Sequence, residues 1–207
     1  MKKFRLLICS GPTQEPIDPV RYISNYSTGT MGKYLNEVAR KRGHRVTWIQ
    51  CPQDAQTARQ LEQKLKSLLP EQDALIMAAA VADVRPAVFS KHKIKKDSIN
   101  NIRLIKNPDI LKALSKQKKK KQVFIGFALE SRDMFDNGLK KLREKKLEAI
   151  VLQKVTENDK PFGDKQIGAF VLEKKGNFAG FKSISKQKLA HFLIRKTERF
   201  LVSKSRD

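Results

Sequence analysis

Five short apolar runs alternate along the chain with segments of helical periodicity, and this alternation most limits the folds that the sequence can adopt. The predicted strands are residues 4–9, 45–51, 73–79, 122–128 and 148–153. The predicted helices are residues 30–42, 55–69, 109–116 and 133–146. Strands that alternate with helices form a parallel sheet with right-handed crossovers. We therefore predict an α/β fold, a Rossmann-like three-layer sandwich with a mainly parallel sheet.

Two further patterns complete the predicted fold. Gly176-Asn177 separates two strand-like runs, 168–174 and 178–182, and indicates a C-terminal β-hairpin. Ser185 is a predicted N-cap for a final amphipathic helix. The apolar stripe of that helix consists of Leu189, Phe192, Leu193, Phe200 and Leu201. For the 133–146 helix the predicted inward-facing residues are Phe135, Leu139 and Leu142.

The connection between the first strand and the first helix, residues 9–32, is rich in Pro, Gly, Ser, Thr and Asp. Such connections usually need about 2–6 residues, so this one is a candidate binding site. Arg21 offers a planar fork for a carboxylate or phosphate, and Asn25 can donate and accept hydrogen bonds without titrating. Ser27-Thr28-Gly29 places hydroxyl and backbone N–H groups at a helix start, which attracts anions. The alternative is a structural loop in which Ser27 or Thr28 is an ordinary N-cap.

Three more polar or small-residue blocks belong to the same predicted edge of the sheet. Residues 79–83 follow the third strand, residues 127–130 follow the fourth, and residues 106–108 precede a helix start. In open α/β sheets, ligands bind at the carboxyl ends of the strands. The sequence therefore predicts that these blocks and the first loop form one site.

Charge and composition limit the class of protein. No apolar run is long enough to span a membrane, and the N-terminal run is too short for a signal peptide, so we expect a cytoplasmic protein. Cys9 and Cys51 are expected to be reduced core thiols.

The net charge of +23 suggests anionic partners. The lysines are spread along the chain with few aromatic residues between them, so a nucleic-acid-binding module is the weaker interpretation. Three scattered histidines indicate no metal site.

Five sequence blocks together resemble one enzyme family, phosphopantothenoylcysteine synthetase, also called phosphopantothenate–cysteine ligase, of coenzyme A biosynthesis. The blocks are EPIDPVRYISNYSTGTMG (15–32), AAAVADVRP (78–86), KIKK (93–96), KNPDIL (106–111) and IGFALE (125–130). They occur in the family's order and spacing, so residues 1–207 are expected to form a single ligase domain. One departure is Gly11-Pro12-Thr13, where the family usually has Gly-Gly-Thr. Proline removes one backbone donor there.

The resemblance implies a reaction that joins 4'-phosphopantothenate to L-cysteine. The carboxylate attacks a nucleoside triphosphate and gives an acyl-nucleotidylate and pyrophosphate, after which the cysteine amine displaces the nucleotide. We favour CTP over ATP as the co-substrate, with Mg²⁺ accompanying the triphosphate. The resemblance also implies a homodimer, with residues 80–107 as an arm and a flap. A flavin-dependent decarboxylase, often fused to such domains in bacteria, is expected to reside elsewhere or to have been removed, and as a separate chain it is a possible partner. Neither a membrane nor nucleic acid is expected as a partner.

The resemblance also assigns site residues. It places Lys93 on the flap against the triphosphate, Asn25 against the acyl intermediate, and Arg21 near the substrate. The remaining nucleotide-binding positions are Met77, Ala78, Ala79, Asp83, Ile105, Lys106, Asn107, Pro108, Phe127, Lys141 and Lys145. Without the resemblance, the alanines would indicate close helix–sheet packing, Asp83 a turn, and the lysines a solvated helix face.

A nicotinamide-dependent reductase is the main rival interpretation, because it shares the Rossmann-like order of elements. Such an enzyme needs G-x-G-x-x-G after the first strand and an acidic residue at the end of the second. Here the first strand leads into Ser10-Gly11-Pro12-Thr13, and the second ends in Gln50-Cys51-Pro52. Both features are missing.

Overall fold

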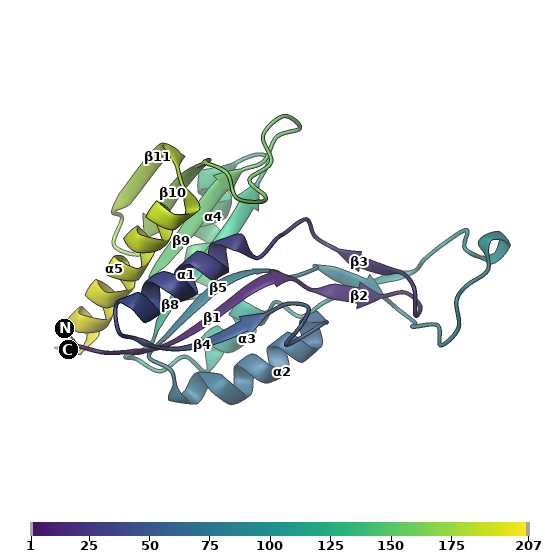
Figure 1. Cartoon of the computed structure of the whole chain (residues 1–207), viewed down its shortest axis with the longest axis horizontal. Coiled ribbons are helices and arrows are strands. Elements are labelled where there is room, and N and C mark those ends of the chain that lie inside the picture. The colour runs from purple at the N-terminus through teal and green to yellow at the C-terminus, as the bar shows by residue number, and fades with distance from the viewer. Residues whose placement is uncertain (1, 206–207) are drawn as a thin grey trace.

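The computed structural model describes residues 2–205, and a seven-stranded sheet forms the centre of the molecule. The strand order is β11-β10-β9-β8-β5-β1-β4 (Figure 1). Strands β1, β4, β5, β8 and β9 run parallel to one another. Strand β10 is antiparallel to β9, and β10 and β11 form an antiparallel hairpin. The strands are β1 (Arg5–Pro12), β4 (Arg45–Gln50), β5 (Ala74–Ala80), β8 (Val123–Glu130), β9 (Ala149–Lys154), β10 (Ile167–Glu173) and β11 (Phe178–Ile184). The predicted α/β class and the C-terminal hairpin are confirmed.

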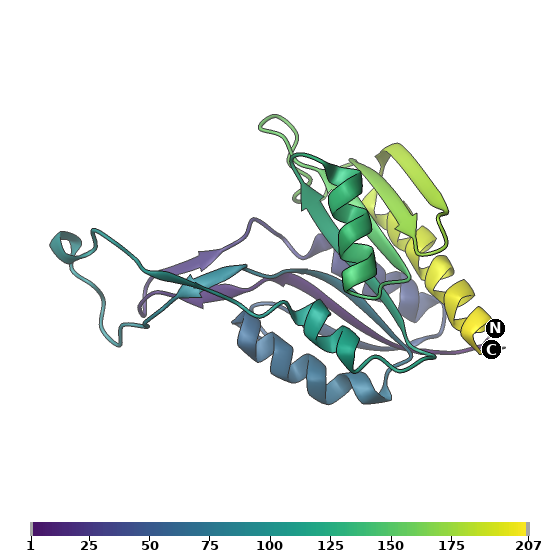
Figure 2. The same cartoon turned by 180° about the vertical axis from the view of Figure 1, so that it is seen from behind.

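Within residues 2–205, five α-helices cover the two faces of this sheet. They are α1 (Thr30–Lys41), α2 (Ala58–Leu68), α3 (Ile110–Lys116), α4 (Met134–Glu144) and α5 (Lys186–Lys204). Helices α1 and α5 pack on one face, and α2, α3 and α4 pack on the other (Figures 1 and 2). A parallel sheet is stable when both of its faces are buried, and each face here has its own apolar core. No helix of the described chain is both long and apolar enough to cross a bilayer.

Two sequence predictions for the helices are wrong in detail. Helix α2 begins at Ala58 rather than at residue 55, because Thr57 and Gln60 form a capping box there. In α4, Leu142 is buried as predicted, but Phe135 and Leu139 are 44% and 39% exposed. The sheet-facing stripe of α4 contains Gly138, which lies so close to Leu152 that a Cβ would be 2.5 Å from its Cδ1. Phe135 and Leu139 therefore lie at the rim of this contact, where the Phe135 ring packs edge-on against Phe170 of β10 and stays partly exposed.

Four short strands build a projection at the end of the molecule opposite the two termini (Figure 1). Strand β2 (Gln14–Pro16) pairs with β3 (Tyr22–Ser24), and β6 (Val84–Pro86) pairs with β7 (Leu104–Lys106). Both pairs are antiparallel and separate from the seven-stranded sheet. Two 3₁₀ turns, η1 (Leu69–Glu71) and η2 (Lys96–Ser98), complete the structure, and η2 lies within the long connection between β6 and β7. We call the two short sheets, together with the connection between β2 and β3 and the connection between β6 and β7, the arm.

Candidate active site

A cavity of about 640 Å³ opens at the carboxyl edge of the sheet, where an α/β fold binds its ligands. The ends of β5, β8 and β9 form its floor, and the start of α1 and the segment before α3 form its sides. This volume falls within the range of about 300–1,000 Å³ that is typical of small-molecule sites. Most of the sequence-predicted positions line it, namely Asn25, Met77, Ala78, Ala79, Asp83, Asn107, Pro108, Phe127, Lys141 and Lys145.

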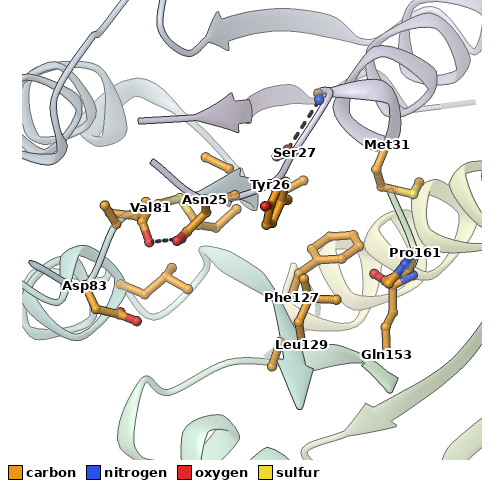
Figure 3. A pocket seen from close by; sticks show the side chains of 18 of the residues that line it. Asn25, Tyr26, Ser27, Met31, Val81, Asp83, Phe127, Leu129, Gln153 and Pro161 are labelled. Carbon is orange, nitrogen blue, oxygen red and sulfur yellow. Dashed lines mark hydrogen bonds between the residues drawn. The ribbon is translucent and has the colours of Figure 1, made fainter. Parts of the chain in front are cut away.

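Two asparagines hold the turn that follows β5. Asn25 Nδ2 donates to the carbonyl oxygen of Val81 at 2.9 Å, and Asn107 Nδ2 donates to that of Ala82 at 2.9 Å. Thr13 Oγ1 accepts from the backbone N–H of Ala82 at 2.9 Å. Asn25, Val81 and Asp83 consequently lie together on one side of the pocket, while Met31, Gln153 and Pro161 lie on the other (Figure 3). The turn is thus fixed from three separate segments.

The floor of the pocket on the β5 side consists of small residues. Ala78, Ala79 and Ala80 are only partly buried although β5 is a central strand. Methyl side chains leave room for a planar group to lie close to the backbone, and the ring of Phe127 on the neighbouring β8 adds an apolar surface. The structure therefore offers a place where a base or a ribose could lie, beside the Asp83 carboxylate.

Two lysines bring positive charge to the pocket, and each has an acidic partner. Lys141 Nζ lies 2.5 Å from Glu130 Oε1, and Lys145 Nζ lies 3.0 Å from Asp109 Oδ2. Their side chains are 39% and 19% exposed, so both can still contact a ligand. The carboxylates hold the ammonium groups at the pocket before any polyanion binds.

The start of α1 adds backbone N–H groups to the same cavity. Gly29 is the N-cap in a left-handed conformation with φ of 71°, and no side chain caps the helix. The alternative that Ser27 or Thr28 caps α1 is therefore wrong; Ser27 Oγ instead accepts from Gly29 N at 3.4 Å (Figure 3). The first turn of α1 contains no acidic residue. An uncapped helix start that lines a pocket is suited to bind an anion.

Four predicted site residues do not line the cavity. Arg21 pairs with Asp18 on the arm, where its side-chain hydrogen bonds hold the pKa of that carboxyl well below the usual range, and it donates to the carbonyl oxygen of Ile94 at 2.8 Å. Lys93, next to Ile94, is exposed on the arm. Ile105 and Lys106 belong to β7, which leads Asn107 and Pro108 into the pocket. The arm thus collects Arg21 and Lys93 away from the other predicted residues.

One wall of the pocket consists of residues 155–166, which were not predicted from the sequence and which we call the wall loop. It connects β9 to β10, and its Pro161 and Phe162 line the pocket together with Gln153 at the end of β9 and Lys186 at the start of α5. The signal was present, because this loop is longer than usual and follows the carboxyl end of a parallel strand. The same reasoning that selected residues 9–32 applies to it.

The structure also bears on two other chemical possibilities. Cys9 and Cys51 are free and buried, and burial raises the pKa of both thiols, so Cys9 is not an activated nucleophile. Among residues 2–205, no three His, Cys, Asp or Glu side chains are grouped to hold a metal ion. Magnesium is commonly bound by one or two carboxylates together with substrate phosphates. Asp83 and Asp109 in the pocket fit that mode, and Mg²⁺ remains a prediction.

Residues 1–200 match the sequence model of the DNA/pantothenate metabolism flavoprotein C-terminal domain. The chain belongs to this family. A relative of unknown prokaryotic origin, named cysteine/cysteine sulfinic acid decarboxylase, is 38% identical over 93% of this chain and 57% of its own length. The coenzyme A biosynthesis bifunctional protein CoaBC of Escherichia coli strain K12 is 33% identical over 78% of this chain and 44% of its own. The chain thus spans about half the length of these curated relatives.

Solved structures agree with the family assignment. The crystal structure of the C-terminal domain of the coenzyme A biosynthesis bifunctional protein CoaBC superposes with a TM-score of 0.80. The two chains are 29% identical, and the match covers 98% of each. The fold of this family member, including its arm and its hairpin, therefore corresponds over nearly its full length to one domain of a two-activity protein.

Proposed function

We propose that this chain is a phosphopantothenate–cysteine ligase that forms 4'-phosphopantothenoyl-L-cysteine through an acyl-nucleotidylate. One observation carries the proposal: a single cavity at the carboxyl edge collects Asn25, the small residues at the end of β5, Asp83 and two lysines. These positions come from distant segments of the chain. The correspondence with the CoaBC C-terminal domain over 98% of both chains supports it.

Each group in the cavity suits one requirement of that reaction. The substrate carboxylate must attack the α-phosphorus of a nucleoside triphosphate, which requires neutralisation of phosphate charge. Lys141, Lys145 and the uncapped start of α1 supply positive potential at the pocket. Asn25 donates to Val81, which leaves a second amide hydrogen and Oδ1 to orient the acyl group. The amine of cysteine then attacks the acyl carbon, and the nucleoside monophosphate departs.

The test of this proposal is pyrophosphate release before cysteine is added. Purified protein with Mg²⁺, 4'-phosphopantothenate and CTP is expected to release about one equivalent per site, and later addition of L-cysteine should yield the amide. ATP replaces CTP in a parallel reaction, because the choice of CTP rests on the resemblance alone. If folded protein releases no pyrophosphate with any nucleoside triphosphate, the ligase proposal is wrong.

A decarboxylase is the second candidate, favoured by the name of the 38% identical relative. That relative is longer than this chain, and the match covers 57% of it. Release of carbon dioxide from cysteine sulfinic acid or from phosphopantothenoylcysteine would identify this activity. Under the ligase proposal, decarboxylation is the task of a flavin-dependent decarboxylase, either a fused domain or a separate chain, and as a separate chain it is a proposed partner.

We further propose that the protein is a homodimer formed through the arm. The arm exposes several large apolar residues, namely Val20, Tyr22, Val88, Phe89 and Leu104, with Val88 at 81% exposure. A projection with such a surface is typical of an interaction site. Arg21 and Lys93 also lie on the arm and outside the pocket of their own chain. Pairing of two arms would cover the apolar residues.

Introducing charge at the arm is expected to separate the dimer. The double substitution Val88→Asp with Phe89→Asp places two carboxylates in the proposed contact, where they would be desolvated without partners. Light scattering during gel filtration at micromolar concentration should show a dimer for the parent protein and a monomer for the variant. Phe178→Asp is the matched control, since Phe178 is 72% exposed on the β10–β11 hairpin. A monomeric parent protein would contradict the proposal.

A further inference from the structure

Lys186 is a buried cation at the pocket that is held by backbone carbonyl groups. It is the first residue of α5 and is 5% exposed. Its Nζ donates to the carbonyl oxygen of Pro161 at 2.9 Å and to that of Gly163. Both of these carbonyl groups belong to the wall loop. Within residues 2–205, Lys186 forms no salt bridge, and the acidic group that attracts its charge is Asp164, also of the wall loop.

This position is unfavourable for a lysine on stability grounds. Burial penalises an ammonium group and lowers the pKa of Lys186. The start of a helix carries partial positive charge, which repels a cation. Ser185 already caps α5 by accepting from Lys188 N at 3.2 Å. Lys186 therefore contributes little that the helix needs, and its contacts instead organise the wall loop.

Two further contacts attach the wall loop to α1 and to the connection before it. The ring of Phe162 lies 5.8 Å from the ring of Tyr26, which belongs to the connection before α1. Tyr34 Oη on α1 donates to Asp164 Oδ2 at 2.8 Å. Pro161, whose carbonyl group binds Lys186, lines the pocket with Tyr26 (Figure 3). The loop therefore spans from α5 to α1, and Lys186 is its attachment on the α5 side.

We propose that Lys186 is a positioning residue that holds the wall loop across the pocket, and that this wall keeps water from the activated acyl group. The proposal rests on the ligase function. An acyl-nucleotidylate reacts with water as well as with an amine. In the unwanted step, the water oxygen bonds to the acyl carbon, the bond from that carbon to the nucleotide oxygen breaks, and the free acid and the nucleoside monophosphate form. A protein that waits for cysteine must exclude this reaction.

The test measures pyrophosphate release without cysteine in Lys186→Met, which removes both bonds to the loop. The parent protein should release one burst and then continue only slowly, because the intermediate is protected. After the burst, the variant should release pyrophosphate about tenfold faster than the parent protein, as each hydrolysed intermediate is replaced. Phe162→Ala, which keeps the hydrogen bonds of Lys186, should likewise increase pyrophosphate release in the absence of cysteine. Lys186→Arg should show a smaller increase than Lys186→Met. Lys188→Met, an exposed lysine on the same helix, is the matched control.

A second measurement does not depend on catalysis. Amide hydrogen exchange in residues 155–166 should be faster in Lys186→Met than in the parent protein and unchanged in Lys188→Met. Unchanged exchange in Lys186→Met would overturn the positioning role. The shielding role would be overturned if exchange is faster in Lys186→Met but both Lys186→Met and Phe162→Ala release pyrophosphate without cysteine as slowly as the parent protein. If the parent protein releases no pyrophosphate at all, the ligase function fails, and the exchange result still decides whether Lys186 holds the loop.

Discussion

Replacing Asn25 by aspartate is expected to allow formation of the acyl-nucleotidylate and then to slow its conversion to amide. Asn25 Nδ2 donates to the carbonyl oxygen of Val81 at 2.9 Å, and an aspartate would place a negative charge there without a donor. The same charge would lie beside the acyl group and its phosphate. Loss of one hydrogen bond to a charged group costs roughly 1.5–3 kcal/mol. This corresponds to a rate that is about tenfold to hundredfold lower.

Rapid-quench analysis of single turnovers checks this expectation, with Lys93→Gln as the contrasting variant. Lys93 is a charge, so its loss should slow the nucleotidyl step, in which phosphate charge is redistributed. Asn25→Asp should accumulate intermediate, and Lys93→Gln should not. Asn177→Asp, in the turn of the β10–β11 hairpin, makes the same chemical change far from the pocket and should behave like the parent protein. If Lys93→Gln accumulates intermediate and Asn25→Asp forms none, the two roles are reversed.

The position of Lys93 links this experiment to the proposed dimer. Lys93 is exposed on the arm and does not line the pocket of its own chain. For it to meet a triphosphate, its own flap must move or a second copy must supply it. If a second copy supplies it, the monomeric Val88→Asp and Phe89→Asp variant should also be slow in the nucleotidyl step. If the flap moves within one chain, that variant should keep the parent rate.

The fold was predictable because its strands and helices carry complete local signals. Each parallel strand in the middle of the sheet is buried on both faces, which gives a continuous apolar run, and the helices between them have helical periodicity. Ser185 at the start of α5 is the predicted side-chain cap, whereas the cap at Thr57 was not predicted and the predicted start of α2 is residue 55. Because parallel strands end at one edge, the sequence alone is sufficient to assign the blocks after β1, β5 and β8 to one site.

Other features depend on contacts that the sequence does not show locally. Phe135 and Leu139 follow a helical period, but the close approach of Gly138 to Leu152 decides which face of α4 meets the sheet. Lys186 resembles any lysine of a basic helix until the fold places the carbonyl groups of the wall loop against it. The arm is an irregular segment whose residues find partners through tertiary contacts, and in our proposal also through a second chain.

Substituting Gly32 by alanine is expected to cause a large loss of stability. A Cβ at Gly32 would lie 2.1 Å from Ser10 Cβ and 2.7 Å from Ser10 Oγ. Ser10 cannot move easily, because it is 1% exposed on the interior strand β1 and Trp48 Nε1 donates to its Oγ at 2.9 Å. Helix α1 must therefore shift away from the sheet. Overpacking of this kind costs about 3 kcal/mol, which lowers Tm by about 6–12 °C in a protein of this size.

A compensating change tests whether this contact is the cause. Ser10→Gly removes the clashing Cβ, after which the nearest atom to a Cβ at position 32 is the Cα of residue 10, at 3.3 Å. Thermal unfolding of Gly32→Ala, Ser10→Gly and the double variant forms a double-mutant cycle. The double variant should lose less stability than the sum of the two single losses, although it lacks the hydrogen bond from Trp48. Gly168→Ala is the control, because a Cβ there comes no closer to a neighbouring atom than 3.5 Å, from Lys182 O. If the two single losses of stability simply add in the double variant, the clash with Ser10 is not the reason that position 32 needs glycine.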